Sequence, residues 1–197
     1  MPKLIAITGG IGSGKSVVCR ILRAMGYEVF DCDSRAKALM DADEGIKERL
    51  AAEIAAETVT EGKIDRAKLS AIVFADKAKL QILNNIVHSA VRENLKQWQA
   101  QHNADVCFVE TAILFESGLN RLVDGEWRVM SPLELRVERT MKRSNMSRQQ
   151  VEARISAQQY TPSPDEPQPA LTIITNDEKS PLLPQIFYKI AEENNKF

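Results

Sequence analysis

The sequence predicts an α/β sandwich built around a parallel β-sheet. Short apolar runs typical of buried strands alternate with longer segments whose apolar residues recur at helical spacing. The first 31 residues show the pattern best: a strand over 4–7, a glycine cluster, a helix over 15–25 closed by Gly26, and a strand over 27–31. A strand, a helix and a strand within about thirty residues make a βαβ unit, which implies parallel pairing with a right-handed crossover.

Residues 34–101 form one long helical excursion between predicted strands. Ala, Leu, Lys and Glu dominate it, and a turn at 61–63 divides it. Later strands are expected over 106–109, 127–130 and 171–175, and helices over 133–143, over 147–159 and from Pro181 onward. A linker before the last strand is predicted by Pro162, Pro164, Pro167 and Pro169. This alternation of elements supports the α/β assignment.

The composition excludes several classes of protein. Hydrophobic residues make up 44% of the 197 residues and charged residues 27%, which is a globular mixture rather than a disordered or collagen-like one. The net charge of −1 argues against nucleic acid or an anionic membrane as the main partner. No apolar run reaches the length of about 18 residues that a membrane helix needs. The 3 cysteines lack CxxC spacing, so we expect no zinc site and no disulfide framework, in a cytoplasmic protein.

Residues 9–16 match a phosphate-binding loop. They run Gly-Gly-Ile-Gly-Ser-Gly-Lys-Ser, which satisfies G-x-x-x-x-G-K-[ST] between a predicted strand and a predicted helix. The glycines allow backbone N–H groups to turn inward around phosphate oxygens, and the helix N-terminus adds further N–H groups and partial positive charge. Lys15 would reach the β- and γ-phosphates, and Ser16 would coordinate Mg²⁺.

The loop is compatible with several kinds of nucleotide-binding protein. A GTPase should carry DxxG and NKxD, and neither pattern occurs in the sequence. A motor ATPase usually has an apolar strand ending in Asp-Glu, whereas the run 106–110 ends in one acidic residue followed by Thr111. A compact kinase of small molecules is therefore favoured. A kinase of some other small hydroxyl acceptor and an ATP-binding regulatory module remain as alternatives.

The acceptor side of a kinase needs a carboxylate near the reacting hydroxyl. Asp31 and Asp33 lie at the carboxyl end of the second predicted strand, which faces the ligand crevice in a parallel sheet. Residues i and i+2 of a strand point the same way, so both carboxylates would face the phosphate loop. Asp33 would then accept the hydroxyl proton. The alternative is that Asp33 or Ser34 caps a helix beginning at Arg35.

Cations for the transferring phosphoryl group are expected on the helical hairpin 133–159. Arg139 and Arg143 are four residues apart and so share a helix face. Other basic residues of this hairpin are Arg136, Lys142, Arg148 and Arg154. Such a hairpin would act as a lid that excludes water, although a solvated face paired with Glu138 and Glu152 is the alternative.

The helical excursion offers a second basic cluster. Its members are Lys63, Arg66, Lys68, Lys77 and Lys79. They would bind an anionic acceptor or form an ordinary solvated face. His88 lies beside the apolar stripe, a position more typical of a packed histidine than of a catalytic one.

Taken together, these motifs resemble the dephospho-CoA kinase family. The resemblance begins with residues 7–16 followed by 29–33, and it continues at 62–66, 69–74, 85–88, 114–118, 139–143, Ser147 and Gln158. It implies a phosphate-loop NTPase sandwich of the nucleoside-kinase-like type, with a five-stranded parallel sheet flanked by helices, a helical substrate subdomain and a lid. It also implies transfer of the ATP γ-phosphate to the 3′-hydroxyl of dephospho-CoA, the last step of coenzyme A biosynthesis.

The resemblance assigns roles to particular residues. The catalytic set would be Asp33 as general base with Lys15, Arg139 and Arg143. ATP would be bound by Gly10, Gly12, Ser13, Gly14, Lys15, Ser16, Val17 and Arg139, with Ser16 on Mg²⁺. Dephospho-CoA would be bound by Thr8, Asp33, Arg66, His88 and Leu114. Residues 1–197 would form one kinase domain, with a nucleotide core at 1–33 and 104–197, a CoA-binding subdomain at 34–103 and the lid at 133–159. We expect a monomer or small homo-oligomer.

The sequence departs from the family pattern at three turns. His88-Ser89 stands where the family often has His-Pro, and Ala112-Ile113-Leu114 stands where a proline often precedes Leu-Leu. Asn176-Asp177 replaces the usual Asn-Gly after the last strand, next to the expected adenine contact.

Overall fold

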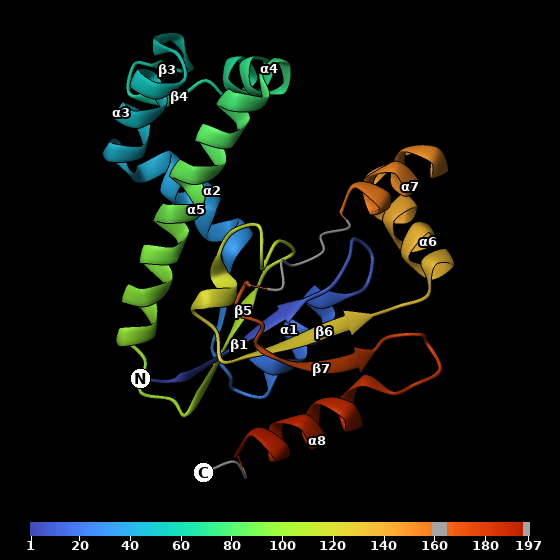
Figure 1. Ribbon diagram of the computed structural model, residues 1–197. Helices are drawn as coiled ribbons and strands as arrows, with labels where there is room; N and C mark the ends of the chain where they lie inside the picture. Colours follow the sequence, from blue (N-terminus) through green and yellow to red (C-terminus); the bar gives the residue numbers. More distant parts are fainter. Residues whose placement is uncertain (159–164, 195–197) are drawn as a thin grey trace. The chain divides into compact units, whose positions relative to one another are not determined.

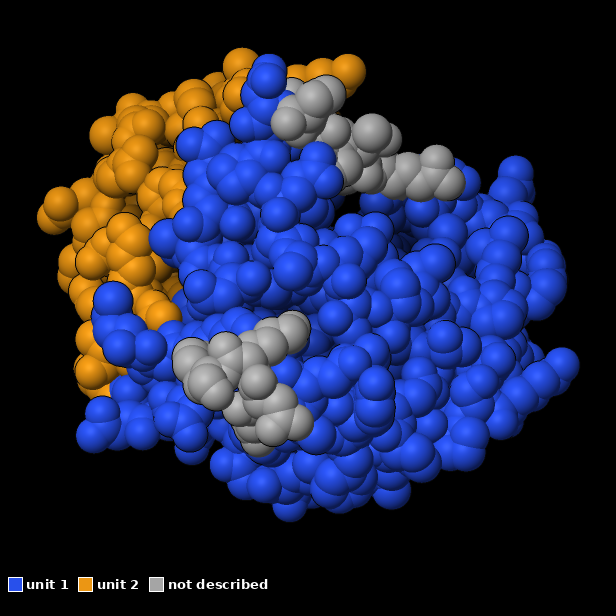
Figure 2. Space-filling model, turned by 60° about the horizontal axis from the view of Figure 1, so that its bottom comes forward, with its two compact units in different colours: residues 1–30, 102–197 blue, residues 31–101 orange. Residues whose placement is uncertain are grey.

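A computed structural model describes residues 1–158 and 165–194 (Figure 1). The chain folds into two compact units (Figure 2): unit 1 comprises residues 1–30 and 102–197, and unit 2 comprises residues 31–101. The boundaries between the core and the helical subdomain were predicted after residues 33 and 103, and the two units divide after residues 30 and 101. The predicted prolines 162 and 164 and the last residue of the helix expected over 147–159 lie outside the described residues.

Unit 1 contains the predicted sheet (Figure 1). Its five strands are ordered β2-β5-β1-β6-β7. Their bounds are β1 Lys3–Thr8, β2 Val29–Asp31, β5 Val106–Glu110, β6 Gly125–Met130 and β7 Ala170–Thr175. Strand β1 pairs in parallel with β5 and with β6, and β6 pairs in parallel with β7. The prediction of an α/β fold with a five-stranded parallel sheet is confirmed.

The central strand is apolar because both of its faces are covered. Residues 4–7 of β1 are buried, as a strand in the middle of a parallel sheet requires. Helix α1 (Lys15–Ala24) presents Val18, Cys19 and Leu22 to this core, and α8 (Leu182–Asn194) contributes Ile186 and Ile190. These helical spacings are the ones that predicted α1 from the sequence.

Unit 2 contains four helices and has an apolar cluster of its own. The helices are α2 Cys32–Ala42, α3 Glu44–Glu53, α4 Arg66–Ala75 and α5 Lys77–Ala100. Each begins after an aspartate whose side chain accepts hydrogen bonds from backbone N–H groups of the first turn: Asp31, Asp43, Asp65 and Asp76. The cluster includes Leu50, Val73 and Ile86. Aspartate caps therefore set the helix starts in this unit.

One small sheet of unit 2 was not predicted. Strands β3 (Val59–Thr60) and β4 (Lys63–Ile64) pair antiparallel on either side of the expected turn. Glu61 and Gly62 both have positive φ, 50° and 71°, as a two-residue hairpin turn requires. Two residues per strand are too few to leave a period-2 pattern in the sequence. Short 3₁₀ turns lie at Ala56–Thr58 and Leu119–Arg121.

The predicted hairpin is formed by α6 (Leu133–Ser144) and α7 (Arg148–Ala157), which follow β6 (Figure 1). Ser147 begins α7 with a capping box closed by Gln150. A separate apolar cluster of Val137, Val151 and Ile155 joins the two helices. No helix among the described residues has the length and hydropathy to cross a membrane.

Candidate active site

The phosphate loop links the central strand to α1. Strand β1 ends at Thr8 and α1 begins at Lys15, so the loop emerges at the carboxyl end of the strand. The Lys15 ammonium folds back onto the loop, where its Nζ donates to the carbonyl oxygens of Gly9 at 2.7 Å and Gly10 at 3.4 Å. Ser13 donates its N–H to the Gly10 carbonyl oxygen at 3.1 Å, which closes the turn. The predicted ATP-binding residues 10–17 therefore form one continuous loop and helix start.

Two glycines of the loop have a backbone conformation and close neighbours that a residue with a side chain would not tolerate. Gly12 and Gly14 have φ of 76° and 96°. A Cβ at Gly12 would lie 2.3 Å from the carbonyl oxygen of Arg136, and a Cβ at Gly14 would lie 2.1 Å from Asn176 Nδ2. The loop is thus closely packed against α6 and against the segment after β7.

Thr8, predicted to bind substrate, is anchored to the neighbouring strand. Its hydroxyl donates to Glu126 Oε1 on β6. Glu126 is only 2% exposed, and its two carboxylate oxygens also accept from Arg128 Nε at 2.8 Å and Nη2 at 3.0 Å. A buried carboxylate needs such partners. Sequence reasoning missed this group, although two charged residues at i and i+2 in an apolar strand were a visible signal.

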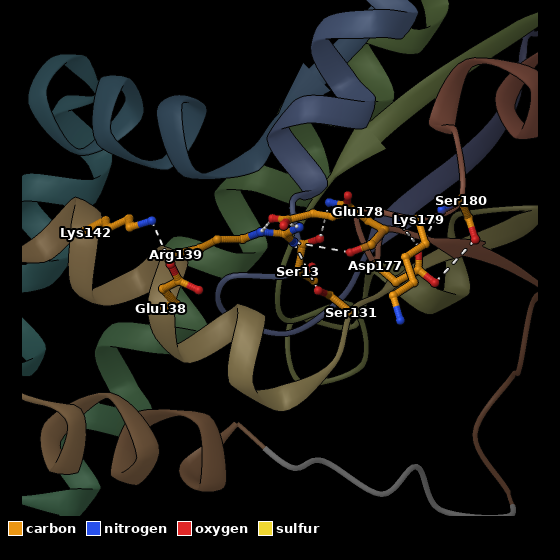
Figure 3. Close-up of polar contacts among 10 residues, drawn as sticks. Ser13, Ser131, Glu138, Arg139, Lys142, Asp177, Glu178, Lys179 and Ser180 are labelled. Carbon is orange, nitrogen blue, oxygen red and sulfur yellow. Dashed lines mark hydrogen bonds and ion pairs between the residues drawn. The ribbon is translucent and has the colours of Figure 1, made fainter.

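Arg139 is held in a polar network beside the phosphate loop (Figure 3). Its Nη1 donates to Ser131 Oγ at 3.0 Å and to the Asn176 carbonyl oxygen at 3.3 Å, and its Nε and Nη2 donate to Glu178 Oε1 at 3.3 and 2.9 Å. Asn176 Nδ2 donates in turn to the Ser13 carbonyl oxygen at 2.8 Å. Arg139 therefore ties α6 to the segment after β7 and, through Asn176, to the phosphate loop.

The departure from the family pattern after β7 has a definite geometry. The Asp177 carboxylate accepts from the backbone N–H groups of Lys179 and Ser180 at 3.0 and 2.7 Å, and these bonds, from Ser180 first, lower the pKa of Asp177. Glu178 takes the left-handed conformation, with φ of 65°. Its ion pair with Arg139 explains what this unusual residue does in the turn.

Arg143, the second predicted lid cation, is placed differently. It lies one turn beyond Arg139 on α6, and its side chain is exposed. Within the described part of the chain its guanidinium has no hydrogen bond or ion pair. The structure thus brings Arg139 to the phosphate loop and leaves Arg143 without a partner among the described residues.

The predicted strand geometry of Asp31 and Asp33 is wrong. Strand β2 ends at Asp31, and Cys32 already belongs to α2, so the two carboxylates do not alternate along one strand. The alternative, in which Asp33 or Ser34 caps a helix beginning at Arg35, is also wrong, because the helix begins at Cys32 and Asp31 caps it. Asp31 Oδ1 accepts from the N–H groups of Asp33 at 3.0 Å and Ser34 at 3.2 Å, and its Oδ2 accepts from the Ser34 hydroxyl at 2.8 Å. A capping side chain started the helix earlier than the apolar pattern indicated.

As a result, Asp33 lies in the first turn of α2 with an exposed carboxylate. That carboxylate has no hydrogen bond or ion pair with any described residue. It belongs to unit 2, together with two other predicted substrate-binding residues. Arg66 begins α4 and pairs with Asp41 at 2.7 Å, and His88 lies half-buried on α5. Burial, followed by the charge of Arg92, lowers the pKa of His88.

Leu114, the remaining predicted substrate-binding residue, belongs to unit 1. Its side chain is 3% exposed, and its carbonyl oxygen accepts from Asn120 N at 3.2 Å. Its contact with substrate stays a prediction.

Comparison with known proteins shows which family has sequences similar to this chain. A family model described as dephospho-CoA kinase matches residues 3–181. A curated dephospho-CoA kinase from Bacteroides fragilis is 38% identical over 188 residues, covering 95% of this chain and 91% of that one. Another from Porphyromonas gingivalis is 41% identical over 155 residues, covering 79% and 77%.

Solved structures extend the similarity to three dimensions. A crystal structure of a Thermus thermophilus protein matches with a TM-score of 0.76 and 35% identity, covering 100% of this chain and 98% of that one. A dephospho-CoA kinase from Campylobacter jejuni matches with a TM-score of 0.65 and 26% identity over the same shares. Sequence, fold and phosphate loop agree, and the chain belongs to the dephospho-CoA kinase family.

Proposed function

We propose that this chain transfers the γ-phosphate of ATP to the 3′-hydroxyl of dephospho-CoA, giving coenzyme A and ADP. The observation that carries the proposal is a phosphate loop with its lysine folded over it, in a chain matched by the dephospho-CoA kinase model over residues 3–181. The reaction completes coenzyme A biosynthesis, and we place it in the cytoplasm, in a monomer or small homo-oligomer.

The phosphate loop would do most of the work by positioning and by neutralising charge. Phosphoryl transfer makes few covalent demands on the protein, since the attacking and leaving oxygens need only be held in line. Backbone N–H groups of residues 10–17 would surround the phosphates at the start of α1, where the helix dipole adds positive charge. Lys15 would exchange its carbonyl partners for phosphate oxygens.

A magnesium ion would fit beside this loop. The Ser16 hydroxyl is exposed in the first turn of α1, and no described residue uses it. Mg²⁺ prefers oxygen ligands and keeps several waters, so one hydroxyl together with substrate phosphates is an adequate donor set. When bound, the ion would supply positive charge that neutralises the phosphates of the nucleotide.

Asp33 is the proposed general base. Because Asp31 caps α2, the Asp33 carboxylate is left without a structural partner in the described chain. An exposed carboxylate at a helix start is suited to accept the 3′-hydroxyl proton as the new bond forms. By resemblance to the family, the residues that would contribute to binding the acceptor are Arg66, His88, Thr8 and Leu114.

The two lid arginines would divide their tasks. Arg139 is already bonded to Ser131, Asn176 and Glu178, so it would chiefly order the nucleotide site. Arg143, which lacks a partner among the described residues, would neutralise the transferring phosphoryl group. The hairpin 133–159 would act as the lid that keeps water out, since hydrolysis is the competing reaction.

A panel of acceptors tests the proposal. ADP release is measured with Mg-ATP and dephospho-CoA, adenosine, pantetheine or no acceptor, and the products are identified by mass. We expect release only with dephospho-CoA, with coenzyme A appearing in step. Release with a different acceptor would keep the kinase and discard the substrate. Slow release in every tube would contradict the enzyme and favour a regulatory nucleotide-binding module.

A further inference from the structure

The tip of the phosphate loop is bonded on both sides to the helical hairpin. Arg136 Nε on α6 donates to the Ile11 carbonyl oxygen at 2.9 Å, and Gln158 Oε1 at the end of α7 accepts from the Ile11 N–H at 2.7 Å. The Ile11 side chain packs against the apolar cluster of Val137, Val151 and Ile155. A single loop residue is thus held through its N–H, its carbonyl and its side chain.

Neighbouring glycines make this approach possible. A Cβ at Gly10 would lie 2.1 Å from Arg136 Nη2, so the guanidinium rests directly on this residue. The carbonyl oxygen of Arg136 itself lies against Gly12. Partial burial lowers the pKa of Arg136, yet a guanidinium stays charged in proteins, so its bond to Ile11 is charge-assisted.

These bonds determine where the loop's other polar groups point. The peptide unit is planar and trans, so its C=O and N–H point in opposite directions. Because the Ile11 carbonyl points to Arg136, the N–H of Gly12 in the same peptide points away from that guanidinium. Because the Ile11 N–H points to Gln158, the Gly10 carbonyl points the other way. The second expectation holds, since that carbonyl accepts from Ser13 N at 3.1 Å and from Lys15 Nζ at 3.4 Å.

We propose that Arg136 and Gln158 are positioning residues for the phosphate loop, which fix the two peptide planes flanking Ile11 and so aim the Gly12 N–H at the bound nucleotide. The inference rests on the proposed function for its choice of nucleotide. Neither residue touches the reacting atoms in this role. The helical hairpin then has a second task besides excluding water: it keeps the loop in its binding conformation.

Mg-ADP affinity, measured by calorimetry without any acceptor, tests the proposal directly. Losing the charge-assisted bond in Arg136→Ala should weaken Mg-ADP binding roughly tenfold. Gln158→Ala should weaken it less, and Arg136→Lys, which keeps one donor, should recover part of the loss. In steady state, the KM for ATP should rise in Arg136→Ala while the KM for dephospho-CoA changes less than about twofold.

Arg148→Ala is the matched control. Arg148 lies on the same hairpin and pairs with Glu134 and Glu152, both at 2.7 Å, and no bond from it to the loop is found among the described residues. Arg148→Ala should remove two ion pairs on the surface of the hairpin and leave Mg-ADP affinity within about twofold of the wild-type value. Equal weakening in Arg148→Ala and Arg136→Ala, or unchanged affinity in Arg136→Ala, would overturn the proposal.

Gly10→Ala supplies an independent arm that does not remove the arginine. Gly10 lacks a left-handed φ, so the added methyl chiefly displaces the guanidinium. As a single change, Gly10→Ala should weaken Mg-ADP binding, but added to Arg136→Ala it should cause little further loss, because both changes act through the same guanidinium. Additive losses in the double variant would refute this shared cause. Thermal melting checks that each variant folds. If the wild type binds Mg-ADP but fails on dephospho-CoA, the proposed function falls while this comparison still stands.

Discussion

Asp33→Asn should greatly lower kcat and hardly change stability, whereas Asp31→Ala should lower stability and reduce kcat less, although the two residues are close in the sequence. Asn keeps the shape of Asp33 but cannot take the hydroxyl proton. General-base catalysis is worth about 10²–10⁴ in rate, or about 2.7–5.4 kcal/mol of barrier. Because the exposed Asp33 carboxylate has no partner among the described residues, Asp33→Asn should change the free energy of unfolding by less than about 0.5 kcal/mol.

Asp31→Ala removes a structural group instead. Its carboxylate accepts two backbone N–H groups and the Ser34 hydroxyl at the start of α2. Losing such a cap costs about 1–2 kcal/mol of stability. We expect a lower unfolding midpoint and a loss of kcat smaller than in Asp33→Asn, since the general base is displaced rather than removed.

Two measurements distinguish the patterns. The kcat is obtained from ADP release at saturating ATP and dephospho-CoA, and stability from urea unfolding followed by circular dichroism. An Asp33→Asn enzyme that keeps more than a tenth of the wild-type kcat would refute the general base. An Asp33→Asn protein as destabilised as Asp31→Ala would show that Asp33 has a structural role.

Three further predictions concern the loop, the turn after β7 and unit 2. Gly12→Ala combines left-handed strain of roughly 1–2 kcal/mol with the 2.3 Å approach to Arg136, so it should reduce Mg-ADP affinity at least tenfold. Gly26→Ala is the control, because Gly26 has φ of 89° but an added Cβ would meet nothing within 4 Å. It should lower stability without lowering Mg-ADP affinity, and similar affinities of Gly12→Ala and Gly26→Ala would contradict the packing argument. Glu178→Gly and Glu178→Gln both remove the ion pair to Arg139, but only glycine relieves the strain at φ 65°. After the entropy cost of glycine is subtracted, Glu178→Gly should melt about 2 °C higher than Glu178→Gln. Equal melting temperatures of the two variants would refute the strain. The pKa of His88 is lowered, mainly by burial, so the unfolded chain takes up its proton first, and stability should fall as the pH drops below about 6.5. His88→Asn should flatten this slope in urea midpoints taken between pH 7.5 and 5.5 (about one unit either side), and an unchanged slope would assign the dependence to other groups.

Local signals explain what could be predicted. The strand 3–8, the glycine loop and α1 follow one another directly, so strand propensity, glycine content and helical spacing specify them within a few turns of chain. Helices α6 and α7 were predicted for the same reason. The start of α2 was misplaced because the Asp31 cap competed with the apolar pattern and began the helix at Cys32.

The sequence by itself therefore determined the α/β class, the phosphate loop and the family resemblance, because each depends on residues close together in the chain. Only the tertiary structure decided the partners of that loop. Ile11 meets Arg136 and Gln158 across 125 and 147 residues, and Asn176 reaches Ser13 across 163. Such pairs depend on the strand order β2-β5-β1-β6-β7, which brings distant loops to the same edge of the sheet. A single polar bond leaves no periodic trace in the sequence, so its partner is known only once the strands are placed.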